Sequence, residues 1–247
     1  MKVAAIDSFL ITCEHGGNRI PATCRRLFRG RRALLDSHRG YDPGALVMAK
    51  ALAKAFGPAP LVTSTISRLV IDLNRSLGHP QLFSAATRSA PATFRAKIIE
   101  QHYRPYRVQV ERLVRQAVSR RRRVIHISSH SFTPELDGKV RRADVGLLYD
   151  PGRRLEAELC ARWKAALAGF APGLRVRRNY PYAGKGDGLT SHLRLRFPRG
   201  AYVGIELEVN QGIVLAGGRC WKTLRGALIA SLRTACSQPR LADIGDP

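Results

Sequence analysis

The stretch VIHISSHSFTP, residues 124–134, decides the fold class. Residues 124–128 form a short apolar run that is typical of a buried strand, and the polar cluster SHSFTP follows it. A basic segment with helical periodicity precedes this strand at about 91–119, and another apolar run follows at 145–149. Strands separated by helical segments predict an α/β fold with a mixed, mostly parallel central sheet flanked by helices.

The same alternation continues toward both ends of the chain. We expect further strands at 9–13, 61–65, 69–73, 174–177 and 202–207, and further helices at 43–56, 153–169 and 221–236. Asp42 and Pro43 form a typical helix start, with Asp42 as the N-cap. The chain has no repeat and no evident linker, so we expect one domain over 1–247, with a core at about 7–236 and a frayed tail at 237–247.

Composition places the chain among globular proteins. Of its 247 residues, 45% are hydrophobic and 24% are charged, which excludes a disordered or collagen-like chain. The apolar runs are shorter than the roughly 20 residues of a membrane-spanning helix, and the N-terminus does not resemble a signal peptide. We therefore expect a cytoplasmic protein without a membrane partner. Five scattered cysteines indicate neither a disulfide framework nor a zinc ribbon.

The charge of the chain departs most from the average. Lys and Arg number 42 against 18 Asp and Glu, which gives a net charge of +24. Such a charge favours the binding of polyanions, so binding of a polyanion or a nucleic acid is an alternative function. The arginines are spread along the chain and match no known nucleic-acid-binding motif, and we therefore expect no specific nucleic-acid partner.

Four polar clusters close predicted strands. They are EHGGN (14–18), DLNR (72–75), SHSFTP (129–134) and ELEVNQ (206–211). Ligands of open α/β sheets bind beyond the carboxyl ends of the strands. The four clusters therefore predict a single functional site.

Two of these clusters contain histidines that can bind a metal. His15 and His130 follow different strands, and their imidazoles can converge on one divalent cation, because zinc prefers nitrogen ligands and catalytic zinc sites use three protein ligands. Glu14, Asn18 and Asp42 are the candidates for the third ligand. The alternative is that both histidines are ordinary loop or core residues and that Asp42 only caps its helix.

Glu206 is the candidate general base. It lies in an apolar strand, where a carboxylate is costly unless it is paired or functional. Strand alternation places Glu206 and Glu208 on one face. A glutamate beside a metal-bound water is the expected proton acceptor, whereas the alternative is a solvent-facing pair on an edge strand.

Other polar residues suit an anionic substrate. Asn74 and Arg75 offer an amide donor and a bidentate fork for a carboxylate, and Arg68 adds a cation. His192 lies in the glycine-containing segment 184–197. This segment is either a mobile loop, from which His192 contacts substrate, or a packed helix end.

Taken in order, the motifs resemble the N-formylglutamate amidohydrolases. The matching pieces are CEHGGNRIP (13–21), YDPGA (41–45), SRLVIDLNR (67–75), SSHSFTP (128–134), VGLLYDP (145–151), NYPYAG (179–184) and IELEVNQ (205–211). The resemblance implies an α/β fold similar to that of zinc carboxypeptidases and aspartoacylases. It also implies hydrolysis of the amide bond of N-formyl-L-glutamate or a related small, anionic N-acyl amino acid.

The resemblance also implies site roles. One zinc ion per chain would be held by His15, His130 and a third ligand, and Asn18 stands where the wider superfamily has its glutamate ligand. Because an amide oxygen is a poor zinc ligand, we expect Asp42 to take its place. The remaining implied roles are the general base (Glu206), oxyanion stabilisation (Arg68) and binding of the substrate carboxylate (Asn74, Arg75). A metal-free relative and a polyanion binder on an inactive hydrolase scaffold are the alternatives.

Overall fold

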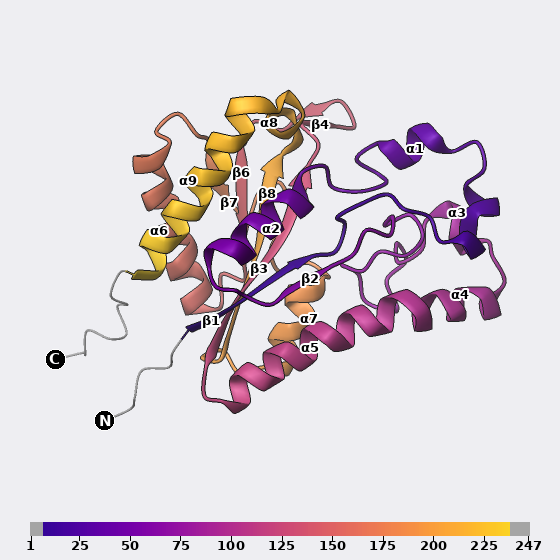
Figure 1. Ribbon diagram of the computed structural model, residues 1–247, viewed down its shortest axis with the longest axis horizontal. Helices are drawn as coiled ribbons and strands as arrows, with labels where there is room; N and C mark the ends of the chain where they lie inside the picture. Colours follow the sequence, from indigo (N-terminus) through magenta and orange to yellow (C-terminus); the bar gives the residue numbers. More distant parts are fainter. Residues whose placement is uncertain (1–6, 238–247) are drawn as a thin grey trace.

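A six-stranded sheet forms the centre of the protein in the computed structural model, which describes residues 7–237 (Figure 1). The strand order is β2-β1-β3-β8-β6-β7. The strands are β1 Asp7–Cys13, β2 Leu61–Thr63, β3 Arg123–Phe132, β6 Val145–Leu148, β7 Val176–Arg178 and β8 Tyr202–Asn210. β6 runs antiparallel to β8 and every other neighbouring pair in this sheet is parallel, which confirms the predicted mixed, mostly parallel sheet. The predicted tail lies outside the described residues, apart from Ser237 at the end of the last helix.

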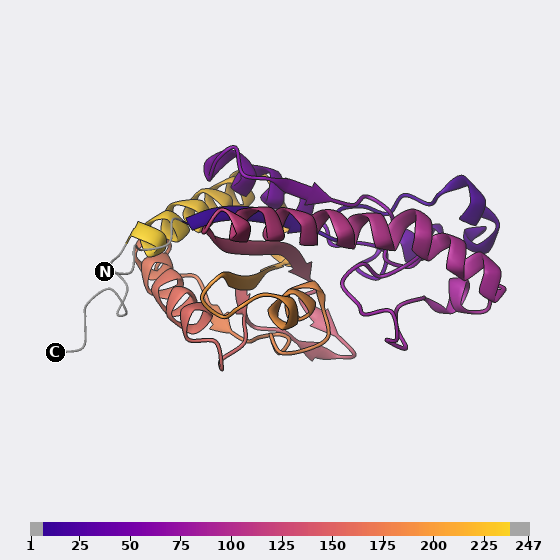
Figure 2. The same cartoon turned by 90° about the horizontal axis from the view of Figure 1, so that it is seen from below.

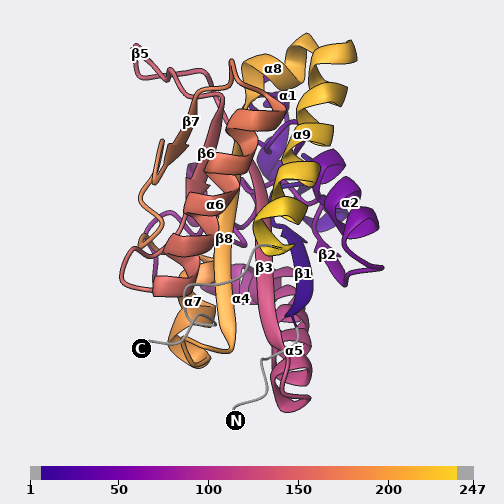
Figure 3. The same cartoon turned by 90° about the vertical axis from the view of Figure 1, so that its left-hand side faces the viewer.

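Helices cover both faces of the sheet (Figure 3). One face packs against α2 Ala45–Ala55, α6 Arg154–Phe170 and α9 Gly218–Ser237, and the other packs against α5 Arg104–Ser119 and α7 Leu189–Arg196. Short elements complete the described chain: η1 Ala22–Phe28, α1 Arg32–Asp36, α3 Ala85–Arg88, α4 Ala92–Ile98, η2 Ile99–Tyr103, α8 Gln211–Ala216 and the hairpin β4 Glu135–Leu136 and β5 Lys139–Val140. Between residues 7 and 237, no helix is long and apolar enough to cross a membrane.

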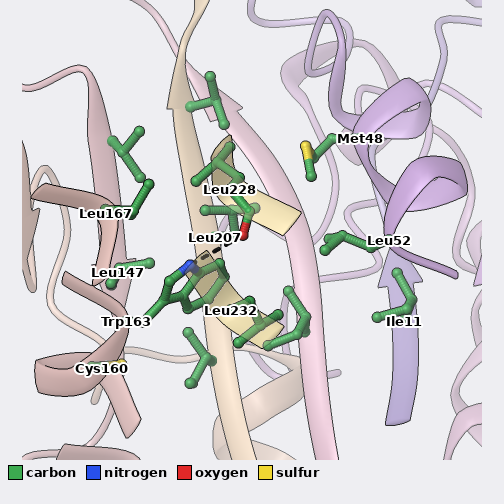
Figure 4. Close-up of a cluster of buried hydrophobic side chains, with 14 of the residues drawn as sticks. Ile11, Met48, Leu52, Leu147, Cys160, Trp163, Leu167, Leu207, Leu228 and Leu232 are labelled. Atoms are coloured by element: carbon green, nitrogen blue, oxygen red, sulfur yellow. Dashed lines mark hydrogen bonds between the residues drawn. The ribbon is translucent and has the colours of Figure 1, made fainter. Parts of the chain in front are cut away.

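The larger core lies between the sheet and the helices α2, α6 and α9 (Figure 4). Trp163 is fully buried at its centre, and its indole Nε1 donates to the carbonyl of Leu228 at 3.3 Å and to Ser231 Oγ at 3.1 Å. These bonds satisfy the polar atom of the ring, so that its apolar surface can pack without a desolvation penalty.

Strand β3 has apolar side chains on one side of the sheet and polar side chains on the other. Ile125 and Ile127 pack in the larger core, while His126, Ser128 and His130 point to the opposite side. All ten residues of the strand are buried. The polar face is therefore stabilised by hydrogen bonds rather than by water, and it leads directly to the site described below.

Three strands, β1, β3 and β8, are longer than predicted, and one predicted strand is absent. β3 and β8 pair as far as Phe132 and Asn210, so His130 lies within its strand rather than after it, and Glu208 lies within β8 together with Glu206. Residues 69–73 form turns, in which the amide of Asp72 donates to the carbonyl of Leu82. The apolar residues of this segment are buried, and such a run does not distinguish a strand from a buried turn.

Two helix predictions need correction. Helix α2 begins at Ala45 with Gly44 (φ 80°) as its N-cap, and Asp42 makes no side-chain capping bond, because its carboxylate faces two histidines and an arginine instead.

The helix predicted at 91–119 forms as α4, a π-helical turn η2 and α5, which run together along one side of the molecule (Figure 2). Pro105 explains the π-helical turn, because it has no N–H to donate to the carbonyl four residues earlier.

Candidate active site

A cavity of about 330 Å³ collects nearly all the predicted site residues. It lies at the end of the sheet where β1, β3 and β8 bring their polar side chains together, as expected for an open α/β fold. Its lining consists of His15, Asp42, Arg68, Asn74, Arg75, His130, Ser131, Tyr182, Ala183, Gly186, Asp187, Glu206 and Glu208.

His15 and His130 meet over one carboxylate. Their ring centroids are 5.1 Å apart. The Nδ1 atom of His15 lies 3.3 Å from Oδ2 of Asp42, and the Nδ1 atom of His130 lies 2.8 Å from the same oxygen. One ligand atom from each of these three buried residues falls within 4.8 Å of the others. Two nitrogens and one oxygen therefore converge on a space that a metal ion could occupy.

The outward nitrogens of both histidines bind buried carboxylates. The Nε2 atom of His15 is 2.7 Å from Oδ1 of Asp72, and that of His130 is 2.9 Å from Oε2 of Glu14. Carboxylates in this position keep the proton on Nε2 and direct the other nitrogen toward a metal. This role of Asp72 was not predicted, because only its place among apolar residues distinguishes it in the sequence, and Glu14 was predicted only as a possible metal ligand.

The two alternatives to Asp42 as third ligand point elsewhere. Glu14 also accepts from Tyr106 Oη at 2.7 Å and from Ser128 Oγ at 2.6 Å, so its oxygens are already engaged. The Nδ2 atom of Asn18 donates to Oδ1 of Asp36 at 2.8 Å, away from the histidines. Asp42 is thus the candidate whose oxygen lies beside both Nδ1 atoms.

The buried charges stabilise one another. Burial alone would raise the pKa of Asp42 and Asp72, but His15 and Arg68 lower the pKa of both carboxyls well below the usual range, and His130 adds to the effect at Asp42. Burial lowers the pKa of His15, as does Arg68, yet the two carboxylates outweigh both and leave that pKa raised. The cluster therefore holds these carboxylates ionised although their side chains are buried.

Arg68 is placed between two of these carboxylates. Its Nη1 is 3.3 Å from Asp42 Oδ1 and its Nη2 is 2.8 Å from Asp72 Oδ2. The side chain keeps 28% of its surface exposed and lines the cavity. Arg68 thus has both a structural role and an edge available to a ligand.

Two glutamates of β8 face the same cavity in different environments. Glu206 is partly exposed, and its Oε1 accepts from Thr190 Oγ1 at 2.7 Å. Glu208 is buried, its Oε2 has no hydrogen-bond partner in the described structure, and burial raises its pKa to about 8. The shared face agrees with the predicted alternation, while the difference between the two environments was not foreseen.

Asn74 and Arg75 hold the loop 180–188 against the cavity. The Oδ1 atom of Asn74 accepts from the amide of Leu189 at 2.7 Å, and Nη1 of Arg75 donates to the carbonyl of Asp187 at 3.1 Å. This loop brings Tyr182 and Asp187 into the lining. Tyr182 belongs to the motif NYPYAG, for which no individual role was predicted, and Asp187 was not among the predicted site residues.

His192 lies apart from the other predicted site residues. Its Nε2 is 3.5 Å from Oε2 of Glu111 on α5, and it is not among the residues that line the cavity. Each of the two interpretations of segment 184–197 holds for a part of it. The glycines form a loop beside the cavity, whereas His192 belongs to the packed helix α7.

Comparisons with known proteins give one family and similar folds. The family model described as N-formylglutamate amidohydrolase matches residues 7–215. The fold is similar to a solved gene product of Agrobacterium tumefaciens, with a TM-score of 0.78, 29% identity, and coverage of 95% of this chain and 92% of that one. It is also similar to the N-formylglutamate amidohydrolase of Ralstonia eutropha JMP134, with a TM-score of 0.67, 21% identity, and coverage of 95% and 94%. No curated protein matches the chain.

Proposed function

This chain belongs to the N-formylglutamate amidohydrolase family, and on that premise we propose that it hydrolyses the amide bond of N-formyl-L-glutamate or a closely related N-acyl amino acid, with one zinc ion bound by His15, Asp42 and His130. One observation carries the proposal. Two imidazole nitrogens and a carboxylate oxygen converge in a cavity whose lining also contains three further carboxyl groups and two guanidinium groups.

The donor set fits zinc. Imidazole nitrogens and a carboxylate oxygen are common zinc ligands, and three protein ligands are typical of a catalytic site. Asp72 and Glu14 bind the outward nitrogens of the two histidines, as carboxylates do around metal-binding histidines. A zinc ion bound there would lower the pKa of a water molecule and polarise the substrate carbonyl.

Arg75 and Asn74 bind the substrate carboxylate. Arg75 uses one N–H for the carbonyl of Asp187 and keeps the others for a ligand. Asn74 uses its oxygen for the amide of Leu189 and therefore keeps its N–H groups. Both side chains are oriented before substrate arrives, which reduces the entropy lost on binding.

The two glutamates divide the proton transfers. Glu206 accepts the proton of the attacking water, and the hydrogen bond from Thr190 Oγ1 holds its carboxylate in place. Arg68 donates a hydrogen bond to the carbonyl oxygen as negative charge develops there. Glu208, whose buried Oε2 has no partner, donates a proton to the leaving nitrogen as the C–N bond breaks. Proton transfer from Glu206 to Glu208 then restores the site.

The test is hydrolysis of N-formyl-L-glutamate by the purified protein, followed as release of formate and L-glutamate. The variant Glu206→Gln is expected to lose a factor of about 10²–10⁴ in kcat while it keeps one zinc per chain. Glu208→Gln is measured in the same assay, because comparing the two variants distinguishes the roles of the two carboxyl groups. Full activity of Glu206→Gln would remove Glu206 from the mechanism.

The metal is tested separately. Treatment with a chelator is expected to abolish hydrolysis, and added zinc to restore it. Activity that survives removal of all divalent ions would exclude the metal part of the proposal. Failure to release formate, or any acyl group, from N-acyl amino acids would exclude the hydrolytic function itself.

The polyanion alternative retains one observation in its favour. Exposed arginines, with Asp36 as the acidic residue among them, gather on η1, α1 and the adjoining loops: Arg25, Arg26, Arg29, Arg31, Arg32 and Arg39. Retention on heparin that weakens steeply with salt, in a protein that binds no metal and hydrolyses no N-acyl amino acid, would favour this alternative.

A further inference from the structure

Among the described residues, Arg75 in the cavity lining and Arg141 beside the lining residue Tyr182 carry charges that no acidic side chain pairs with. Arg75 lines the cavity and donates to a backbone carbonyl, whereas Arg141 follows β5 and donates through Nη1 to Tyr182 Oη at 2.9 Å. Within residues 7–237, neither guanidinium has a carboxylate oxygen within 4.0 Å. Arg68 differs from both, because two carboxylates already neutralise it.

Arg141 and Tyr182 form one unit. The guanidinium carbon of Arg141 lies 4.9 Å from the centroid of the Tyr182 ring, and Tyr182 lines the cavity. Because Arg141 donates to the phenolic oxygen, the hydroxyl proton of Tyr182 remains available for a ligand. The pair therefore presents an O–H donor backed by a positive charge.

The main chain holds Arg141 in place. Its amide donates to the carbonyl of Pro134 at 2.7 Å across the hairpin β4–β5. Its carbonyl accepts from Nδ2 of Asn210, at the end of β8, at 3.4 Å. The residue is therefore attached both to the hairpin and to the strand that carries Glu206 and Glu208.

Other cations near the mouth are less suited to an anion. Lys185 already has a carboxylate partner, Asp150, at 3.7 Å. Burial lowers the pKa of His38, and Arg39, Arg141 and Arg68 lower it further, which disfavours the charged form of His38. Arg141, which contacts the lining residue Tyr182, can supply a second positive charge to a ligand.

We infer that Arg141 and Tyr182 bind a second anionic group of the substrate and so select N-acyl amino acids with an acidic side chain. The inference rests on the proposed function. Arg75 and Asn74 hold the α-carboxylate, and Arg141 with Tyr182 holds the side-chain carboxylate. A neutral side chain leaves the charge of Arg141 without a partner, and a site built for a polar group rejects a ligand that lacks it.

The test compares two substrates that differ in one charge, N-formyl-L-glutamate and N-formyl-L-glutamine. In Arg141→Gln, kcat/KM is expected to fall about tenfold for the glutamate compound and less than about twofold for the glutamine compound. Tyr182→Phe is expected to shift selectivity in the same direction by a smaller factor. Arg142→Gln is the matched control, because Arg142 is an exposed neighbour and its loss changes the net charge by the same unit.

Three results would overturn the inference. They are an equal loss for both substrates in Arg141→Gln, no loss for either, and an equal effect of Arg142→Gln. Melting temperatures of all variants show whether each is folded, and Arg141→Lys, which keeps the charge, is expected to retain more of the selectivity than Arg141→Gln.

Binding separates this inference from the proposed function. If the wild type releases no formate from either compound, hydrolysis is refuted, and calorimetry with L-glutamate and L-glutamine on zinc-treated protein decides the role of Arg141. Arg141→Gln is then expected to bind L-glutamate about tenfold more weakly and L-glutamine unchanged. Equal binding of L-glutamate by the variant and the wild type would overturn the inference.

Discussion

Replacing Glu14 with glutamine tests whether a buried carboxylate orients His130. Glu14 has no exposed surface, and its two oxygens accept hydrogen bonds from Tyr106, Ser128 and His130 at 2.7, 2.6 and 2.9 Å. Glutamine has nearly the same shape but no charge. The change therefore removes the ion pair with His130 while it leaves the packing almost intact.

The hydrogen bonds of Glu14 determine how much stability and zinc affinity the substitution is expected to cost. An amide has one acceptor oxygen, and its NH₂ group must face at least one of the three donors. One buried donor left without an acceptor costs about 1–3 kcal/mol of unfolding free energy. Because Nε2 of His130 loses its carboxylate, the orientation of Nδ1 is no longer fixed, and zinc affinity is expected to fall by a factor of about 10–100.

The assay pairs urea unfolding with zinc competition against a chelating dye. Glu156→Gln is the control, since Glu156 is also buried, and it binds Arg194 and the amide of Gly204 rather than a histidine. Both variants are expected to lose stability, whereas only Glu14→Gln is expected to bind zinc more weakly. Unchanged zinc affinity in Glu14→Gln would refute the orienting role.

Three further results are expected. Zinc at 100 times its Kd adds about 2.7 kcal/mol of stability, or a rise of roughly 5–10 °C in melting temperature, and an equal rise in His130→Ala would contradict the ligand assignment. Burial lowers the pKa of His126 from 6.5 to about 4, so the unfolded chain binds an extra proton between these values, and stability falls by about 3 kcal/mol as the pH drops through that window. In urea titrations at several pH values, His126→Asn is expected to lack this pH-dependent part of the unfolding free energy. An unchanged dependence of stability on pH in the variant would disprove the role of His126. Trp163→Ala is expected to cost about 3–5 kcal/mol in calorimetry with zinc affinity unchanged, and a loss below about 1 kcal/mol would contradict its place in the core.

The fold class followed from the alternation of strands and helices because that pattern is local. Residues 124–128 have the composition of a buried strand wherever they lie, and their neighbours along the chain show helical spacing. The ends of β3 and β8 were not predictable in the same way. They depend on pairing between Phe132 and Asn210, which are far apart in the sequence, and on hydrogen bonds that make polar strand residues tolerable.

The site was predictable where a residue type carries its own chemistry. His15 and His130 were predicted as metal ligands because imidazoles near strand ends can bind a metal, and the structure places their rings next to each other. The partners that orient them, Asp72 and Glu14, depend on contacts over 57 and 116 positions that no local pattern shows. Asp42 shows the opposite case, because its local capping pattern is strong but its carboxylate instead contacts His15, His130 and Arg68, which lie far from it in the sequence.

The two-faced character of β3 limits how a protein of this architecture can change. Inserting or deleting one residue in the strand would exchange its faces and send His126, Ser128 and His130 into the packing beneath α2. New substrate preferences are therefore more accessible through the connections at the rim, such as 135–142 and 180–188, where length and composition can vary while the ladder of hydrogen bonds remains in register.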